Sequence, residues 1–129
     1  MNKLLDKKLC DKYPEIFKDR NRDMRETAMC WGFECDEGWF NLIDNLCSDI
    51  MRVCGKEIPV ATQVKEKYGT LCFYINGGNE AVFRAISKAD QKSFHTCEVC
   101  GKKGKIRENS HQWFKTLCDK DAKGYDKAA

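Results

Sequence analysis

Hydrophobic residues recur with a helical period in the stretch that follows Asp36. The apolar positions stand three, four and seven residues apart: Trp39, Ile43, Leu46, Cys47, Ile50 and Cys54. This spacing places them on one face of an α-helix. Asp36 suits the N-cap of this helix, and Gly55 suits the position after its C-terminus. The pattern predicts one long amphipathic helix.

After Pro59 the period changes from helical to two. Val60, Thr62 and Val64 form one side of a predicted strand, and Leu71, Phe73 and Ile75 form one side of the next. Tyr68-Gly69 lies between them and is typical of a tight turn. The sequence therefore predicts an antiparallel hairpin whose core-facing side carries these apolar residues.

Two further helices are predicted on either side of these elements. The first covers Asn2 to Lys12, with Leu4, Leu5 and Leu9 on one side, and Pro14 ends it. The second runs from Glu80 to about Phe94 after an Asn79 cap. Its apolar stripe is Val82, Phe83, Ile86 and Ala89. Residues 1–94 are thus expected to form an α+β core, with helices packed on a small antiparallel β-sheet.

The segment from residue 95 to 129 has a different character and is expected to form a zinc-ribbon-like module with a flexible tail. Cys97-Glu98-Val99-Cys100-Gly101 is a Cys-x2-Cys-Gly turn, a spacing that lets two thiolates bind one metal ion. Cys118 follows after a predicted hairpin with strands over 105–108 and 112–117. The expected hairpin core is Ile106, Trp113, Phe114 and Leu117.

The fourth ligand of this predicted structural Zn²⁺ site is open to alternatives. Asp121 stands three residues after Cys118, where a second Cys-x2-Cys pair would end, so we predict Cys97, Cys100, Cys118 and Asp121 as the ligands. The alternatives are His111, His95, water or another cysteine. A further alternative is that the cysteines merely pack without metal.

Enzymatic chemistry is not expected. Glu98 or Asp121 would be the candidate base for a catalytic zinc, but three thiolates make zinc a poor Lewis acid. The chain has neither a His-Glu-x-x-His arrangement nor a Gly-x-Ser-x-Gly motif. A binding protein is the expected class.

Composition and charge indicate the cellular compartment and limit the classes of partner. Nine cysteines, an odd number, together with a charged N-terminal stretch that does not fit a signal peptide, indicate reduced thiols in a cytoplasm. No apolar run is long enough to predict a membrane span. The net charge of +3 is too small to imply nucleic acid, although Lys65, Lys67, Tyr68 and Tyr74 make a basic and aromatic surface conceivable. The oligomeric state is not predicted.

A segment rich in aromatic residues and glycine surrounds Cys30 and Cys35. It suits a contact surface or a second metal site that uses the Cys-x4-Cys pair. Packing of its aromatic residues at the start of the long helix is the favoured alternative, because aromatic side chains dominate core burial.

Three blocks together resemble a widespread family of small bacteriophage proteins. The blocks are CWGFECDEGWF over 30–40, TQVKEKYGTLCFY over 62–74, and CEVCGK over 97–102 with Cys118. Members of that family tend to end in Cys-x2-Cys or Cys-x2-His, whereas Asp121 stands at that place here.

The resemblance implies a phage origin and expression in the cytoplasm of the bacterial host. Accessory proteins of this kind often bind and block a host machine, and zinc-containing anti-CRISPR inhibitors of Cas9-like nucleases belong to that group. The expected partner is therefore a host defence protein complex. The alternatives are a nucleic-acid-binding accessory protein that uses the basic ribbon, or a sponge or hydrolase for a small defence signalling molecule.

Overall fold

The computed structural model describes residues 1–125 and the backbone of residues 127 and 128. Its helices are α1 (Lys3–Lys12), α2 (Phe40–Val53) and α3 (Glu80–Ser93), with short 3-10 turns η1 (Lys18–Asn21), η2 (Met29–Trp31) and η3 (Glu37–Trp39). Its strands are β1 (Phe33–Glu34), β2 (Val60–Lys67), β3 (Thr70–Asn76), β4 (Lys105–Glu108), β5 (Phe114–Leu117) and β6 (Lys127–Ala128). The predicted α+β class is confirmed.

The strands form two small sheets. In the first, β2 lies between β1 and β3; β2 and β3 are antiparallel, while β1 runs parallel to β2 with Phe33 opposite Val64. In the second, β4 lies between β5 and β6 and is antiparallel to both. Part of the expected flexible tail thus pairs as β6, and residues 126 and 129 lie outside the described residues.

The β2–β3 hairpin forms as predicted, but the expected inward face of β2 is wrong. Ala61 and Val64 are fully buried, whereas Val60 and Thr62 are only half-buried. The pairing with β3 shifts between Ala61 and Gln63. This bulge adds one residue to β2, so the inward-facing positions are three residues apart instead of two.

Two predicted apolar positions on the helices are also wrong. Leu4 on α1 and Phe83 on α3 are mostly exposed, while Leu9, Val82 and Ala89 are buried. Phe83 lies one position, or about 100°, beyond Val82 around the helix, so it falls at the edge of the stripe. The predicted Asn79 cap forms, with its side chain accepting from Val82 N–H at 2.9 Å. Asn2, which was predicted as the first residue of its helix, is instead the N-cap of α1 and accepts from Leu5 N–H at 2.9 Å.

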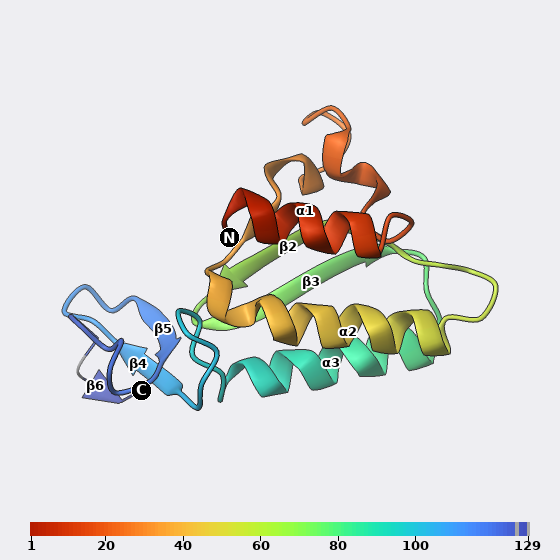
Figure 1. The fold of residues 1–129 in the computed structure, drawn as a ribbon. Coiled ribbons are helices and arrows are strands. Elements are labelled where there is room, and N and C mark those ends of the chain that lie inside the picture. Colours follow the sequence, from red (N-terminus) through yellow and green to blue (C-terminus); the bar gives the residue numbers. More distant parts are fainter. Residues whose placement is uncertain (126, 129) are drawn as a thin grey trace.

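The core lies between the helices and one face of the first sheet. In Figure 1, α2 and α3 run side by side next to the β2–β3 hairpin, and the C-terminal strands project at one end of the molecule. Phe17 packs edge-on against Phe33 and Phe73, with ring centroids 4.9 Å and 6.2 Å away. Trp39 and Ile43 are fully buried beside them in the same cluster. This core is the platform on which the C-terminal hairpin rests.

One buried polar residue joins α3 to the edge of β3. Ser93 has no exposed surface; its hydroxyl accepts a hydrogen bond from Leu71 N–H at 3.0 Å and donates to Asp90 C=O at 2.5 Å. We expect Ser93→Ala to lower the free energy of unfolding by about 1–3 kcal/mol, because it leaves the Leu71 amide buried without its acceptor. Urea denaturation measures this, with the exposed Ser87→Ala on the same helix as the control. Equal stability of the two variants would contradict the prediction.

Among the helices of the described chain, none is long and apolar enough to cross a membrane.

Candidate metal centre

The first half of the candidate metal centre is a tight turn over residues 97–102 that follows α3. We call this turn the knuckle. The backbone amide of Cys97 donates to Lys102 C=O at 2.7 Å, and Gly101 N–H returns to Cys97 C=O at 2.9 Å. Gly101 has a φ of +80°, which favours glycine. The knuckle places the thiols of Cys97 and Cys100 on the same side, toward the candidate metal position. Cys97 is buried and Cys100 is exposed.

The second half comes from the end of β5. Cys118 directly follows this strand, and a turn in which Asp121 N–H donates to Cys118 C=O at 3.2 Å brings Asp121 back to the same point. The Cys118 thiol donates to Asp121 Oδ2 at 3.2 Å. This hydrogen bond is the main cause that lowers the pKa of Asp121 while the thiol keeps its proton.

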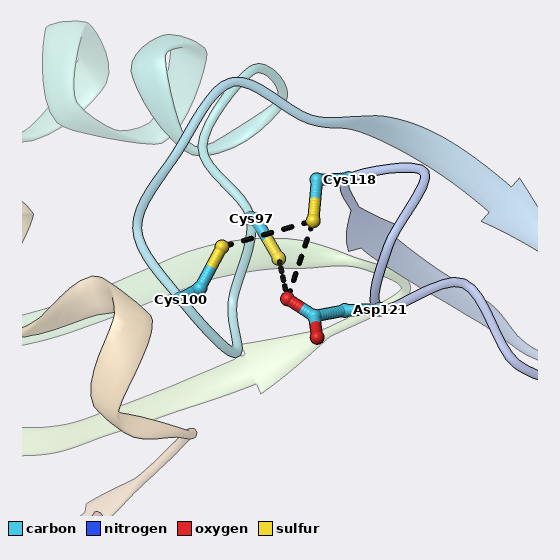
Figure 2. A group of neighbouring side chains, drawn as sticks. All are labelled: Cys97, Cys100, Cys118 and Asp121. Carbon is cyan, nitrogen blue, oxygen red and sulfur yellow. Dashed lines mark hydrogen bonds between the residues drawn. The ribbon is translucent and has the colours of Figure 1, made fainter.

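The structure brings the four predicted ligands together. Figure 2 shows the side chains of Cys97, Cys100, Cys118 and Asp121 pointing toward one another, and their ligand atoms all lie within 4.8 Å of one another. Cys100 Sγ and Cys118 Sγ are 3.7 Å apart, far beyond the roughly 2.05 Å of a disulfide bond. The cluster can hold a metal ion. Neither His95 nor His111 belongs to it, and both are exposed.

Glu98, the other candidate base, is engaged elsewhere. The residue is 2% exposed, and Oε2 accepts from Asp36 N–H at 3.0 Å. The other oxygen, Oε1, is buried without a hydrogen bond among the described residues and lies 3.7 Å from Lys115 Nζ. Burial is the main cause that raises the pKa of Glu98, while the Asp36 amide and Lys115 oppose the rise. Glu98 therefore connects the knuckle to the loop at Asp36.

The knuckle is docked on the segment that precedes α2. Gly38 N–H donates to Glu98 C=O at 2.7 Å, and the indole N–H of the buried Trp39 donates to Thr96 C=O at 2.9 Å. The approach is so close that a Cβ added to Gly38 would lie 2.3 Å from the Cys97 carbonyl oxygen. Sequence reasoning did not find this contact, because its acceptors are backbone carbonyls.

A second contact joins β5 to the turn between β2 and β3. The buried hydroxyl of Thr116 donates to Gly69 C=O at 2.7 Å, and Glu98 N–H donates to Thr116 C=O at 2.9 Å. The metal-ligand cluster is therefore tied to the core at both the segment before α2 and the β2–β3 turn. An ion held by the cluster would stabilise these contacts as well as the hairpin.

The interior of the hairpin differs from the prediction. Leu117 is buried as expected, but Trp113 is 68% exposed, and Ile106 and Phe114 are only half-buried. Thr116 and Arg107 take the buried positions; Arg107 Nε donates to Leu117 C=O at 3.0 Å. A four-residue hairpin is too thin to enclose an indole, so its interior is made from polar groups with satisfied hydrogen bonds.

The aromatic segment around Cys30 and Cys35 forms η2, the short strand β1 and η3. Cys35 is buried, and burial is the main cause that raises its pKa to about 12; the Cys30 thiol donates to Thr27 C=O at 3.3 Å. Within residues 1–125, neither cysteine belongs to a group of three or more potential ligands. Trp39 is buried and Trp31 is 62% exposed, so part of the segment is core and part is surface.

Comparison of the chain with protein-family models, with curated proteins and with solved structures finds no match. The resemblance to bacteriophage proteins stays a prediction.

Proposed function

We propose that the protein is a zinc-stabilised, non-enzymatic phage accessory protein that binds and inhibits a host defence effector of the Cas9-like nuclease type. The cluster of four potential metal ligands is the main observation behind this proposal, because four protein ligands would make zinc a fixed part of the fold. The nature of the partner rests on the resemblance of the three sequence blocks. The site of action would be the cytoplasm of the bacterial host.

The spacing of the ligand atoms supports zinc as the ion. Tetrahedral zinc, with bonds of about 2.3 Å to sulfur and about 2.0–2.2 Å to oxygen, holds two sulfur ligands about 3.8 Å apart and a sulfur–oxygen pair about 3.5–3.7 Å apart. Three of the six pairs of ligand atoms come close to these values: Cys100 Sγ and Cys118 Sγ are 3.7 Å apart, and Asp121 Oδ2 lies 3.2 Å from Cys118 Sγ and 3.4 Å from Cys97 Sγ. All the ligand atoms lie within 4.8 Å of one another. Thiolates also favour zinc over magnesium or calcium.

The completeness of the ligand set supports a structural role. A catalytic zinc keeps one position for water or substrate, whereas four protein ligands occupy all positions of a tetrahedral site. The nearby Glu98 is held by Asp36 N–H and lies close to Lys115, so it is not placed as a free base. Both observations favour a binding protein.

The three blocks that carry the phage resemblance meet in space. Gly38 and Trp39 of the first block bond to the backbone at Glu98 and Thr96, and Gly69 of the second accepts from Thr116 beside the third. Residues far apart in sequence thus form one unit around the candidate metal centre. This arrangement gives a physical reason for the blocks to occur together, as an inhibitor with a fixed surface requires.

Asp121 offers a direct test of the proposed ligand set. We expect Asp121→Ala to lower the affinity for Zn²⁺ at least about tenfold, and Asp121→Cys to raise it by a similar factor, because thiolate is the softer ligand. Competition with a chromophoric chelator measures both changes. Asp119→Asn is the matched control, since Asp119 pairs with Arg107 outside the cluster. Unchanged affinity in both Asp121 variants would mean that Asp121 is not a ligand.

The inhibitor role is tested with a purified Cas9-like nuclease loaded with guide RNA. We expect the zinc-loaded protein to bind this complex during gel filtration and to block cleavage of target DNA at near-equimolar concentration. A Cys118→Ser variant that has lost zinc should not inhibit. Panels of other defence effectors extend the test if this nuclease is unaffected.

The alternative functions predict different results in the same experiments. A nucleic-acid-binding protein would bind oligonucleotide at physiological salt, with an affinity that falls as salt rises. A sponge would bind a small signalling nucleotide and leave the effector complexes free. Either result, without inhibition of any effector, would overturn the proposal.

A further inference from the structure

A groove lined by aromatic side chains lies where the C-terminal hairpin meets the β2–β3 turn. Its volume is about 340 Å³, enough for one large side chain. Its aromatic members are Tyr68, Trp113, Phe114 and Tyr125, and its charged members are Glu66 and Lys115. We call it the aromatic groove. Because it takes residues from both the core and the hairpin, its shape depends on the docking of the zinc-bearing unit.

Two of its aromatic side chains are largely exposed to solvent. Tyr68 is 72% exposed and Trp113 is 68% exposed. The exposure of about two thirds or more of two large aromatic residues in one groove gives up much of the burial energy that such side chains normally contribute. A surface of this kind is typical of a contact for another molecule.

The backbone at the groove is strained as well. Among the described residues, Tyr68 and Gln112 are the two non-glycine residues with positive φ, at +53° and +63°. Both line the groove. Such a conformation costs about 1–3 kcal/mol for a residue with a Cβ and is concentrated at functional sites. Tyr68 and Gly69 both have positive φ in the two-residue turn between β2 and β3, and Gln112 precedes Trp113 in the turn between β4 and β5.

The charge around the groove favours a cation. Lys115 Nζ lies 3.7 Å from Glu98 Oε1 and 3.8 Å from Asp36 Oδ2, so two carboxylates already offset the lysine. Glu66 adds a third carboxylate at the groove wall, where its Oε2 accepts from Gly69 N–H at 2.7 Å. A phosphate group would meet repulsion from Glu66, whereas a cation would be attracted to it and to the electron-rich ring faces.

The ring of Tyr68 already accepts a cation within the chain. The amine of the exposed Lys67 lies 5.7 Å from its centroid. Lysine on a flexible stem is a weak occupant of such a site, and an arginine from a partner can replace it with a planar guanidinium that stacks on aromatic rings.

From these observations we propose that the aromatic groove binds an arginine side chain on a basic surface of the partner protein. This inference rests on the proposed function: an effector that holds guide RNA and target DNA carries positively charged surfaces. Trp113 and Tyr68 stack on the guanidinium, and Glu66 supplies the opposing charge. An inhibitor seated in this way covers a cationic group that the effector needs for nucleic acid.

A capped peptide of alternating glycine and arginine is the probe for the groove. Calorimetric titration of the zinc-loaded full chain should give saturable binding that weakens as NaCl is raised. Trp113→Ala should weaken binding at least about tenfold, and Glu66→Gln, which keeps the acceptor for Gly69 N–H but removes the charge, about fivefold. Trp31→Ala, which removes an equally exposed indole outside the groove, should leave binding unchanged. Zinc content and thermal unfolding establish that each variant is folded.

Three results would overturn the inference. The first is no binding of the arginine peptide to the wild-type chain. The second is equal binding by the Trp113→Ala and Trp31→Ala variants. The third is tighter binding of single-stranded oligothymidylate than of the peptide, lost in Trp113→Ala, which would make the groove a nucleic-acid site.

Failure of this inference differs from failure of the proposed function. If the wild-type chain and Trp113→Ala inhibit the nuclease equally, the groove is not the contact while the inhibitor role stands. If the wild-type chain inhibits no effector but binds the arginine peptide through Trp113, the inhibitor role is wrong while the groove stands.

Discussion

Replacement of Cys97 by serine is expected to abolish zinc binding and to unfold the C-terminal hairpin. Cys97 is fully buried, and its backbone closes the knuckle through Lys102 and Gly101. Structural zinc contributes about 10–16 kcal/mol in small peptides, whereas a whole domain is stable by only about 5–15 kcal/mol. The hairpin buries few apolar side chains, so it has little else to stabilise it. We expect a loss of more than about 4 kcal/mol.

Metal analysis and amide hydrogen exchange measure this effect. Zinc should fall to background, and residues 97–121 should lose protection, together with Gly38 N–H, which donates to the knuckle at 2.7 Å. Cys72→Ser is the matched control, because Cys72 is a half-buried thiol on β3 outside the cluster. Full zinc content and unchanged protection in Cys97→Ser would show that this thiol is not a ligand.

Replacement of Gly38 by alanine is also expected to lower the free energy of unfolding strongly. The added Cβ would lie 2.3 Å from the Cys97 carbonyl oxygen and 2.4 Å from that of Glu98, where real contacts of this kind do not occur. Both obstacles are backbone atoms of the knuckle, so relief requires the knuckle to move away from η3 and to break the hydrogen bonds from Gly38 and Trp39. We expect a loss of about 3 kcal/mol in the free energy of unfolding.

Urea denaturation of the zinc-loaded protein measures the Gly38→Ala effect. Glu37→Ala is the control, because Glu37 is exposed at the preceding position of the same turn. We also expect Gly38→Ala to bind zinc more weakly than the control, since undocking the knuckle loosens Cys97 and Cys100. If the two variants unfold at the same urea concentration, the close docking of the knuckle is wrong.

The long helices could be predicted from sequence because the regular spacing of their apolar residues and their caps are local patterns. The helical spacing from Trp39 to Cys54 places α2, and the Asn79 cap places the start of α3. The predicted Asp36 cap of α2 is wrong, because the 3-10 turn η3 comes between them and Trp39 is the N-cap. The two-residue strand β1 has no period to detect, and its parallel pairing with β2 depends on a contact across about 30 residues. The bulge in β2 was missed for a similar reason, since one inserted residue leaves the composition of the strand unchanged.

The candidate metal centre was likewise predictable only in part from the sequence. The intervals between Cys97, Cys100 and Cys118 predicted that these three thiols come together, because a Cys-x2-Cys pair and a later cysteine at this distance are typical of a shared metal site. Spacing alone left Asp121 as one of several candidates for the fourth position, and the structure places it in the cluster. The partners of the knuckle were not predictable from spacing. Gly38 is recognisable as a close-contact position only when the Cys97 and Glu98 carbonyls are seen beside it. Trp113 was expected inside the hairpin, where a four-residue strand pair has no room for it.

Metal content, measured together with chemical unfolding, tests the central claim most directly. The protein should be purified without added zinc and unfolded in urea with and without a strong chelator. We expect about one zinc per chain and a large loss of stability when the metal is removed. A chain that carries no metal and unfolds identically in chelator would contradict it, because the four clustered side chains would then only pack against one another.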